Sequence, residues 1–401
     1  MQEENIKTLS FGCRLNALES EKIAKMLRGH ISGAIVVNTC GVTAEGERQS
    51  AQAVRKIARE NPAVPIFVTG CAATRNPELF SKIPHVIVIP NTDKLNLDAY
   101  MGHDVGSNAR IDRFAFRKNV LSKQYIQVQN GCHHDCTYCV TRLVRGPAVS
   151  FNYTDILDDA RAAIDNGFSE IVLTGVDTAS YARDGMLIAD VCAGLLRDVS
   201  GIKRLRLSSL DPASPQVPRI LDMMDDPRMM GHIHLSMQSG SDPVLQAMRR
   251  RHTADMVRGL VAHAAPHVTF SWDIICGFPG ETDELWDQTM QLARQLRPIH
   301  IHAFPFSPRP GTVAADMPNQ IQRETARERT AAINQLANNN RIMYMRQRIG
   351  EITSVLVESH NMARDPHDIP VRIAGKSVPQ RTVCDVRLVG MDGDIFVGES
   401  V

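Results

Sequence analysis

The segment 131–139 constrains the fold of this chain more than any other part of the sequence. Its three cysteines, Cys132, Cys136 and Cys139, lie within eight residues. Three thiolates this close together can hold only one small, soft metal centre. A closed tetrahedral zinc site or an all-cysteine iron–sulfur cube needs four ligands, so this spacing leaves one coordination position open. Zinc, with His133 or His134 as a fourth ligand, remains an alternative on ligand chemistry alone.

Three further cysteines each follow a short apolar segment that is typical of a β-strand. Cys13, Cys40 and Cys71 each stand next to a glycine, just beyond the segments 7–10, 34–37 and 66–69. If these strands are parallel neighbours, the three thiols gather at one carboxyl edge, where open α/β sheets keep their ligand sites. The alternative is that the three cysteines are unrelated core residues. That alternative does not explain why each of them stands next to a glycine just after a strand-like segment.

Composition limits the environment and the partners of the chain. It has 401 residues, nine cysteines and a net charge of +1. The sequence contains no run of eighteen apolar residues and no secretory segment at its acidic N-terminus, so we expect a cytoplasmic protein, no membrane partner and reduced thiols. A near-zero charge gives no sign of a DNA partner, and any RNA surface must be local. Three cysteines are expected to be packing residues, namely Cys192, Cys276 and Cys384.

Several sequence motifs together resemble the radical S-adenosylmethionine (SAM) methylthiotransferases, and most closely the branch that acts on threonylcarbamoyladenosine in tRNA. The resemblance covers nearly the whole chain. It rests on the two cysteine triplets in this order and on the segments 10–16, 19–21, 38–43, 69–72, 173–176, 208–210, 238–241, 277–281 and 307–312.

The pattern of elements and the resemblance predict the same α/β architecture. The segments 125–128, 170–174, 204–207, 233–237, 268–275 and 300–304 read as strands with helices between them, which fits an open (β/α)6 barrel. We expect a parallel α/β domain with the auxiliary cluster (1–101), a linker (102–122), a radical SAM barrel (123–345) and a small antiparallel β-barrel resembling a TRAM domain (346–401).

The resemblance also implies two [4Fe-4S] clusters and SAM as cofactors. Cys132, Cys136 and Cys139 would hold the cluster that cleaves SAM to a 5′-deoxyadenosyl radical. Cys13, Cys40 and Cys71 would hold an auxiliary cluster that presents a methylated sulfur. Because the cofactors carry the chemistry, no side chain is assigned as a general base. Contacts to SAM are expected from Tyr138, Gly175, Ser208 and Gln238.

The implied substrate is the anticodon loop of tRNA, and the implied reaction is methylthiolation at C2 of N6-threonylcarbamoyladenosine at position 37. Arg142 and Arg145 follow the loop that holds Cys132, Cys136 and Cys139, and they are expected to bind phosphates of the anticodon loop. A low-potential electron donor is a further expected partner. Asp177 and the segment 140–144 depart from the family pattern. Isopentenyladenosine in tRNA, an aspartate of a ribosomal protein, and a non-catalytic RNA-binding role with structural zinc remain as alternatives.

Overall fold

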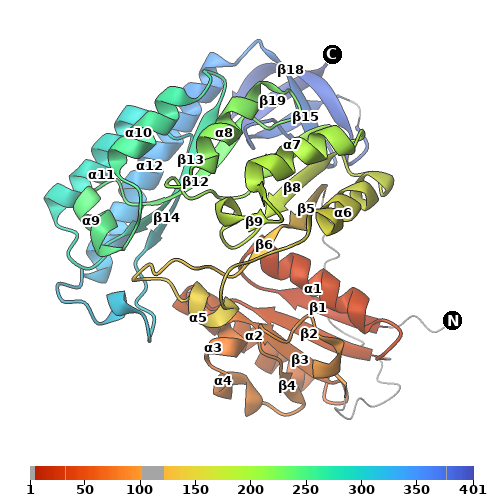
Figure 1. The fold of residues 1–401 in the computed structure, drawn as a ribbon. Coiled ribbons are helices and arrows are strands. Elements are labelled where there is room, and N and C mark those ends of the chain that lie inside the picture. The colour runs from red at the N-terminus through yellow and green to blue at the C-terminus, as the bar shows by residue number, and fades with distance from the viewer. Residues whose placement is uncertain (1–4, 32, 102–121, 376) are drawn as a thin grey trace. The chain divides into compact units, whose positions relative to one another are not determined.

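The computed structural model describes residues 5–31, 33–101, 122–375 and 377–401 (Figure 1). Residues 102–121, which make up nearly all of the predicted linker, lie outside the described part. The chain forms two compact units. The N-terminal unit comprises Met1–Asn119, Asn130–Ala148 and Ser307–Ala315, and the C-terminal unit comprises Val120–Gln129, Val149–Phe306 and Asp316–Val401.

A four-stranded parallel sheet in the order β1-β2-β3-β4 forms the centre of the N-terminal unit. Both faces of β2 are buried: Ile35 and Val37 share a core with helix α2, and Ala34 and Val36 share another with α1. This explains the continuous apolar run that predicted the strand. The elements are β1 (Asn5–Ser10), α1 (Arg14–Leu27), β2 (Gly33–Thr39), α2 (Ala44–Glu60), β3 (Ile66–Gly70), α3 (Cys71–Arg75), α4 (Glu78–Ser81), β4 (Val86–Val88), η1 (Leu97–Ala99) and α5 (Thr141–Arg145).

Six parallel strands form the first part of the C-terminal unit, which confirms the predicted open α/β barrel. They lie in two sheets, β11-β8-β5 and β12-β13-β14. A parallel bridge between Leu210 and Leu235 connects β12 with the segment after β11, and β5 and β14 are the outer strands. The strands are β5 (Lys123–Gln127), β8 (Glu170–Thr174), β11 (Arg204–Leu207), β12 (His232–Gln238), β13 (Thr269–Cys276) and β14 (His300–Pro305).

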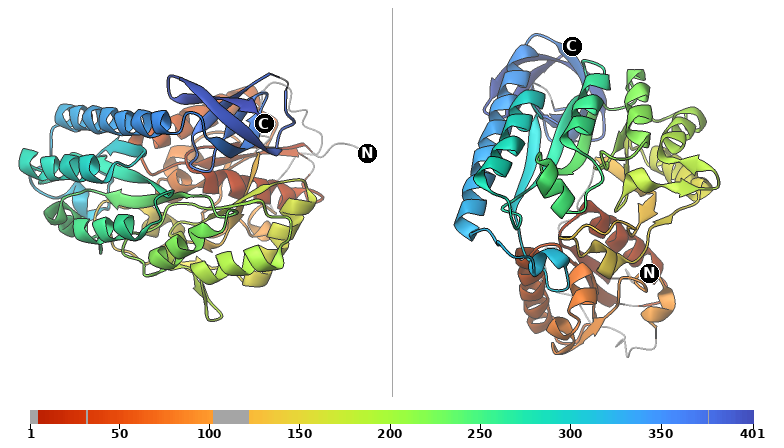
Figure 2. Two further views of the ribbon diagram at one scale, coloured as in Figure 1. Left: turned by 90° about the horizontal axis from the view of Figure 1, so that it is seen from above. Right: turned by 60° about the vertical axis from the view of Figure 1, so that its left-hand side comes forward.

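One apolar core joins these strands to their helices. Figure 2 shows the ribbon of these helices, coloured from yellow-green to blue, from two further directions. No helix among the described residues combines the length and the apolar character needed to cross a bilayer. The helices and short elements of this unit are β7 (Val149–Ser150), α6 (Tyr153–Asp165), η2 (Thr178–Ser180), β9 (Ala182–Arg183), β10 (Met186–Leu187), α7 (Ile188–Asp198), α8 (Gln216–Asp222), η3 (Met223–Asp225), α9 (Asp242–Ala247), α10 (Ala254–His263), α11 (Asp283–Leu296) and α12 (Arg323–Gln347). β6 (Gln129–Asn130) is divided between the two units, and η4 (Val313–Ala315) belongs to the N-terminal unit.

A closed five-stranded barrel in the order β15-β16-β17-β19-β18 ends the chain, as predicted. All of its strand pairs are antiparallel except β17 with β19, which is parallel. Closure leaves no unpaired strand edge. The strands are β15 (Ile352–Ser359), β16 (Met362–Arg364), β17 (Pro370–Ala374), β18 (Val383–Asp392) and β19 (Ile395–Ser400).

Buried charges join this C-terminal barrel to the first residues of the parallel strands. Glu170, at the start of β8, is fully buried and accepts hydrogen bonds from Arg204 Nε at 2.6 Å and Arg206 Nε at 2.9 Å. Lys123 Nζ, at the start of β5, lies 3.5 Å from the same carboxylate and donates to Asp368 of the barrel at 2.7 Å. The strand starts and the barrel therefore share one ion-pair network.

Candidate functional site

The structure brings the second cysteine triplet together at the carboxyl edge of the N-terminal sheet. Cys13 is the N-cap of α1, Cys40 directly follows β2, and Cys71 is the first residue of α3 directly after β3. Burial raises the pKa of the Cys40 thiol, and the neighbouring Cys71 and Cys13 thiolates raise it further. Three thiols that interact in this way form one donor set.

Small residues leave room for a soft inorganic group at this donor set. A Cβ built on Gly12, whose φ is +82°, would lie 2.5 Å from Cys40 Sγ, and one on Gly46 would lie 3.2 Å from it. Asn38 Oδ1 and Thr69 Oγ1, on the strands that lead to Cys40 and Cys71, are buried without a hydrogen-bond partner among the described residues. Thiolate donors, glycine-sized neighbours and the Thr69 hydroxyl, which can donate a hydrogen bond, fit an iron–sulfur cluster; Asn38 Oδ1 accepts only and adds nothing to this fit.

The first triplet, which consists of Cys132, Cys136 and Cys139, lies in the loop between β6 and α5. Gly131 begins this loop with a φ of +68°, and a Cβ there would overlap the Pro147 carbonyl oxygen at 1.9 Å, so glycine is required. The backbone N–H of Cys132 donates to the Gly146 carbonyl at 3.2 Å, and that of Cys139 donates to the Cys136 carbonyl at 3.1 Å. These hydrogen bonds hold the backbone of the loop in one conformation.

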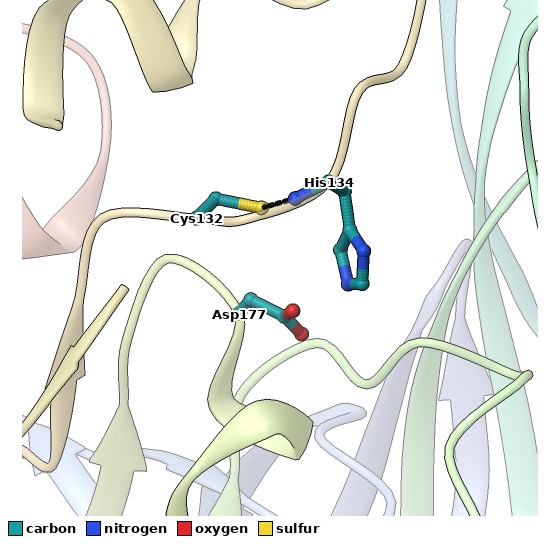
Figure 3. A group of neighbouring side chains, drawn as sticks. All are labelled: Cys132, His134 and Asp177. Atoms are coloured by element: carbon teal, nitrogen blue, oxygen red, sulfur yellow. Dashed lines mark hydrogen bonds between the residues drawn. The ribbon is translucent and has the colours of Figure 1, made fainter. Parts of the chain in front are cut away.

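Two backbone N–H groups point at sulfur atoms of this loop. The N–H of His134 donates to Cys132 Sγ at 3.3 Å (Figure 3), and the N–H of Thr141 donates to Cys139 Sγ at 3.4 Å. Hydrogen bonds to sulfur stabilise the thiolate that ligates a metal and influence the reduction potential of a cluster. Tyr138, next to Cys139, is half-buried. The loop therefore fits a cluster with three cysteine ligands.

The two arginines that follow this loop have different surroundings. Arg142 is exposed, with 53% of its side chain accessible, and it pairs with Asp135 at 3.3 Å. Arg145 is buried, and its guanidinium donates to Glu19 and to Asn16. A guanidinium engaged inside the protein is not available to an RNA phosphate, so the prediction that Arg145 contacts RNA is corrected.

Gly175, Ser208 and Gln238 follow or end β8, β11 and β12, at the carboxyl edge of the strands in the C-terminal unit. Ser208 Oγ shares a hydrogen bond of 2.8 Å with Thr178 Oγ1. Gln238 has a φ of +70°, a left-handed conformation that costs a non-glycine residue about 1 kcal/mol or more. Such conformations are concentrated at functional sites.

Sequence reasoning missed Gln129, which holds the turn after β8. Its Oε1 accepts hydrogen bonds from the N–H groups of Val176 at 3.0 Å and Asp177 at 2.9 Å. A Cβ on Gly175 would lie only 3.0 Å from the same oxygen, so this glycine makes room for a side chain of the protein itself. The sequence gives no signal for this role, because Gln129 and Asp177 are 48 residues apart.

The remaining three cysteines belong to the C-terminal unit. Cys192 and Cys276 are fully buried in the core of the C-terminal unit, and burial raises the pKa of each thiol to about 12. Cys384 is half-buried and packs against the core of the C-terminal barrel. All three therefore serve as packing residues, as predicted.

Comparisons with known proteins agree with this geometry. Residues 126–293 match the radical SAM superfamily, and residues 5–90 match an uncharacterized protein family, UPF0004. The chain has the fold of the radical SAM methyltransferase TsrM from Kitasatospora setae, with a TM-score of 0.57 and 14% identity over 75% of this chain and 68% of that one.

Curated relatives are similar over almost their whole length. The threonylcarbamoyladenosine tRNA methylthiotransferase MtaB of Rickettsia prowazekii is 34% identical over 96% of this chain and 94% of its own. MtaB of Thermotoga maritima is 30% identical over 90% and 88%. The tRNA-2-methylthio-N(6)-dimethylallyladenosine synthase of Geotalea uraniireducens is 31% identical over 97% and 94%. With its two cysteine triplets, this chain belongs to the radical SAM methylthiotransferase family.

Proposed function

We propose that this chain is a tRNA methylthiotransferase that replaces the hydrogen at C2 of N6-threonylcarbamoyladenosine, at position 37 of the anticodon loop, with a methylthio group. The observation that carries the proposal is the pair of cysteine triplets within one compact unit. The 34% identity to a threonylcarbamoyladenosine enzyme over nearly the whole chain supports this substrate.

Each triplet has a separate task in this proposal. Cys132, Cys136 and Cys139 hold a [4Fe-4S] cluster, and the triplet of Cys13, Cys40 and Cys71 holds a second one. When bound, these clusters and SAM supply the radical that takes a hydrogen atom from an unactivated carbon and the sulfur that replaces it.

The protein's own groups position the reactants. The N–H groups of His134 and Thr141 stabilise the first cysteine loop. The proposed contacts to SAM are Tyr138, Gly175, Ser208 and Gln238; Ser208 follows β11 and Gln238 ends β12. Arg142 is exposed beside the first loop and is proposed to hold an anticodon-loop phosphate. A low-potential electron donor completes the reaction.

Dimethylallyladenosine in tRNA, the isopentenyladenosine named above, is the second candidate substrate, because a relative named for that modification is 31% identical to this chain. Nucleoside analysis of tRNA from cells that lack the gene separates the two candidates. Loss of the methylthio form of threonylcarbamoyladenosine alone is expected. Loss of the methylthio form of dimethylallyladenosine instead would overturn the assignment.

An experiment with the purified protein tests the division of labour. Cys13→Ala should still release 5′-deoxyadenosine under strong reductant but form no methylthio product, since SAM binds at the other triplet. Cys384→Ala makes the same chemical change in a packing cysteine and should retain both activities. Full methylthiolation by Cys13→Ala would contradict the proposed role of the second triplet.

A further inference from the structure

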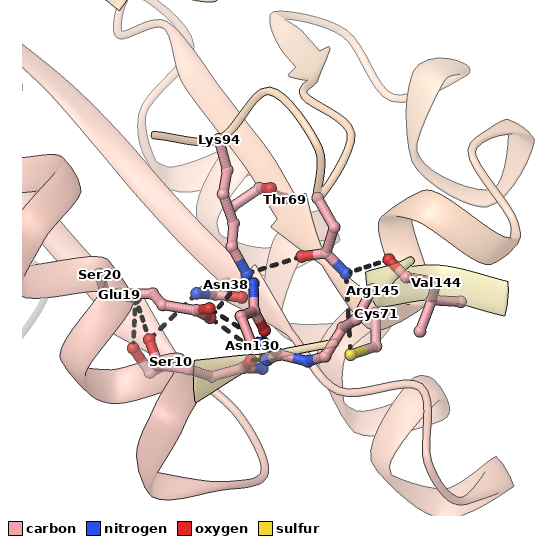
Figure 4. Close-up of polar contacts among 12 residues, drawn as sticks. Ser10, Glu19, Ser20, Asn38, Thr69, Cys71, Lys94, Asn130, Val144 and Arg145 are labelled. Atoms are coloured by element: carbon pink, nitrogen blue, oxygen red, sulfur yellow. Dashed lines mark hydrogen bonds and ion pairs between the residues drawn. The ribbon is translucent and has the colours of Figure 1, made fainter. Parts of the chain in front are cut away.

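Three buried charged side chains form one network in the N-terminal unit (Figure 4). The Glu19 carboxylate on α1 is fully buried and accepts a hydrogen bond from Lys94 Nζ at 2.6 Å. It also accepts from Arg145 Nη1 at 2.9 Å and from Nη2 at 3.2 Å. The side chains of Lys94 and Arg145 are only 2% and 3% exposed. When Lys94 and Arg145 are both protonated, two cations share one carboxylate and leave a net charge of +1. Burial and the neighbouring Arg145 lower the pKa of Lys94, and Glu19 and Cys71 oppose this.

This net charge lies beside the second cysteine triplet. Lys94 Nζ donates to Asn91 Oδ1 at 2.8 Å, and Asn91 Nδ2 lies 3.9 Å from Cys71 Sγ. Burial opposes the charge of Arg145, but Glu19 together with the thiolates of Cys71 and Cys13 outweighs it and raises the pKa of Arg145. The excess positive charge therefore interacts favourably with the negatively charged sulfur atoms of Cys71 and Cys13.

The same network reaches the backbone next to Cys13 and Cys40. Arg145 Nη2 donates to Asn16 Oδ1 at 2.6 Å. Asn16 Nδ2 in turn donates to the carbonyls of Phe11 at 2.9 Å and Thr39 at 3.1 Å. Phe11 lies two residues before Cys13, and Thr39 lies one residue before Cys40. All three cysteines of the triplet are thus connected to the network.

The network also reaches the first cysteine loop. Arg145 is the last residue of α5, which begins two residues after Cys139, and the next residue, Gly146, accepts the hydrogen bond from the Cys132 N–H. Asn91 Nδ2 donates to the Val144 carbonyl of the same helix at 2.9 Å. The helix that follows the first triplet is therefore anchored to the residues around the second.

We infer that Lys94, Glu19 and Arg145 are positioning residues that place one net positive charge beside the second triplet and fix the helix after the first triplet to it. The inference rests on the proposed function, because it takes the second triplet to hold an iron–sulfur cluster. A carboxylate and a single cation would already form a neutral buried pair. The second buried cation is not needed to neutralise Glu19, and its burial costs desolvation free energy. An anionic cluster nearby compensates for this cost.

The charge should affect the reduction potential of this cluster. Net charge and hydrogen bonding around a cluster are main determinants of its potential, and a nearby cation favours the reduced, more negative state. Removing one cation should therefore make the midpoint potential more negative. Replacing the carboxylate by an amide should make it more positive.

The test uses the full-length chain with Cys132, Cys136 and Cys139 changed to alanine, so that only the second cluster contributes to a redox titration followed by electron paramagnetic resonance. Lys94→Gln and Arg145→Gln should each shift the midpoint to a more negative potential, and Glu19→Gln should shift it to a more positive one. Lys94→Arg retains the charge and should restore the parental value. Lys82→Gln is the matched control, because it removes the same charge from a side chain that is 79% exposed.

The outcomes separate the inference from the proposed function. Midpoints of Lys94→Gln and Arg145→Gln that equal those of the parent and of Lys82→Gln, in proteins that contain iron, would overturn the inference alone. A parent that binds no iron after anaerobic reconstitution would overturn both the proposed function and the inference. If one of the cation variants does not fold, the negative shift in the other and the opposite, positive shift in Glu19→Gln still decide the question.

Discussion

Glu170→Gln should destabilise the C-terminal unit at neutral pH. The change removes the buried carboxylate that Arg204, Arg206 and Lys123 share. Burial alone would raise the pKa of Glu170, but the three cations outweigh burial and lower it from the ordinary 4.5 to about 2. This difference corresponds to about 3 kcal/mol of folding free energy at pH 7. Removing one partner of a buried ion pair typically costs about 3–5 kcal/mol, which agrees.

The sign of the pH dependence follows from the lowered pKa. A carboxylate with a depressed pKa in the folded state stabilises the fold above its unfolded pKa, near 4.5, and this contribution is lost as the pH falls towards about 2. The difference in unfolding free energy between the wild type and Glu170→Gln should therefore be constant above pH 6. It should decrease by about 1 kcal/mol between pH 7 and pH 4.

Tryptophan fluorescence provides the assay, because both tryptophans of the chain, Trp272 and Trp286, lie in the C-terminal unit. Urea unfolding of the metal-free protein gives the free energies. Glu324→Gln, a change of the same kind at a side chain that is 72% exposed, should alter stability by less than about 0.5 kcal/mol. A loss below about 1 kcal/mol for Glu170→Gln at pH 7, or a difference that grows towards pH 4, would refute the reasoning.

Three further predictions concern the cofactor and RNA sites. Gly12→Ala should lose the iron of the second triplet, about half of the total, because its Cβ would lie 2.5 Å from Cys40 Sγ; Gly29→Ala has a similar φ of +85° but open space, and should retain all of the iron. Gln238→Gly should relieve a left-handed backbone at +70° and keep or raise the unfolding temperature, but it should weaken SAM binding in equilibrium dialysis; unchanged affinity would exclude the contact. Arg142→Ala should weaken tRNA binding and reduce the slope of log K against log salt by about 0.7, whereas an unaltered slope would exclude a phosphate contact.

The parts of the fold that depend on local patterns were predictable. The strands before Cys40 and Cys71 could be predicted because their apolar runs are buried in a parallel sheet, whereas the strand before Cys13 is half-buried. Neighbouring parallel strands end at the same edge of the sheet. The convergence of these cysteines followed from topology alone. The six strands of the C-terminal unit and the final closed barrel were predictable for the same reason.

The parts that depend on distant partners were not predictable. Arg142 and Arg145 lie in the same short helix beside the same loop, so the sequence suggests the same role for both. Only the position of Glu19, 126 residues from Arg145, shows that one faces solvent and the other is buried in an ion pair. Gln129 was missed for the same reason, since a side-chain amide that caps a distant turn leaves no periodic signal in the sequence.

The N-terminal unit consists of three separate stretches of chain, and this limits how it can be recombined. Glu19 pairs with Arg145 from the second stretch, and Glu47 pairs with Arg309 from the third. A fragment that ends near residue 101 would lack both arginines and would leave two carboxylates without these partners. Exchange of this unit between relatives, by recombination or by design, therefore has to transfer all three stretches together and cannot rely on a single crossover point.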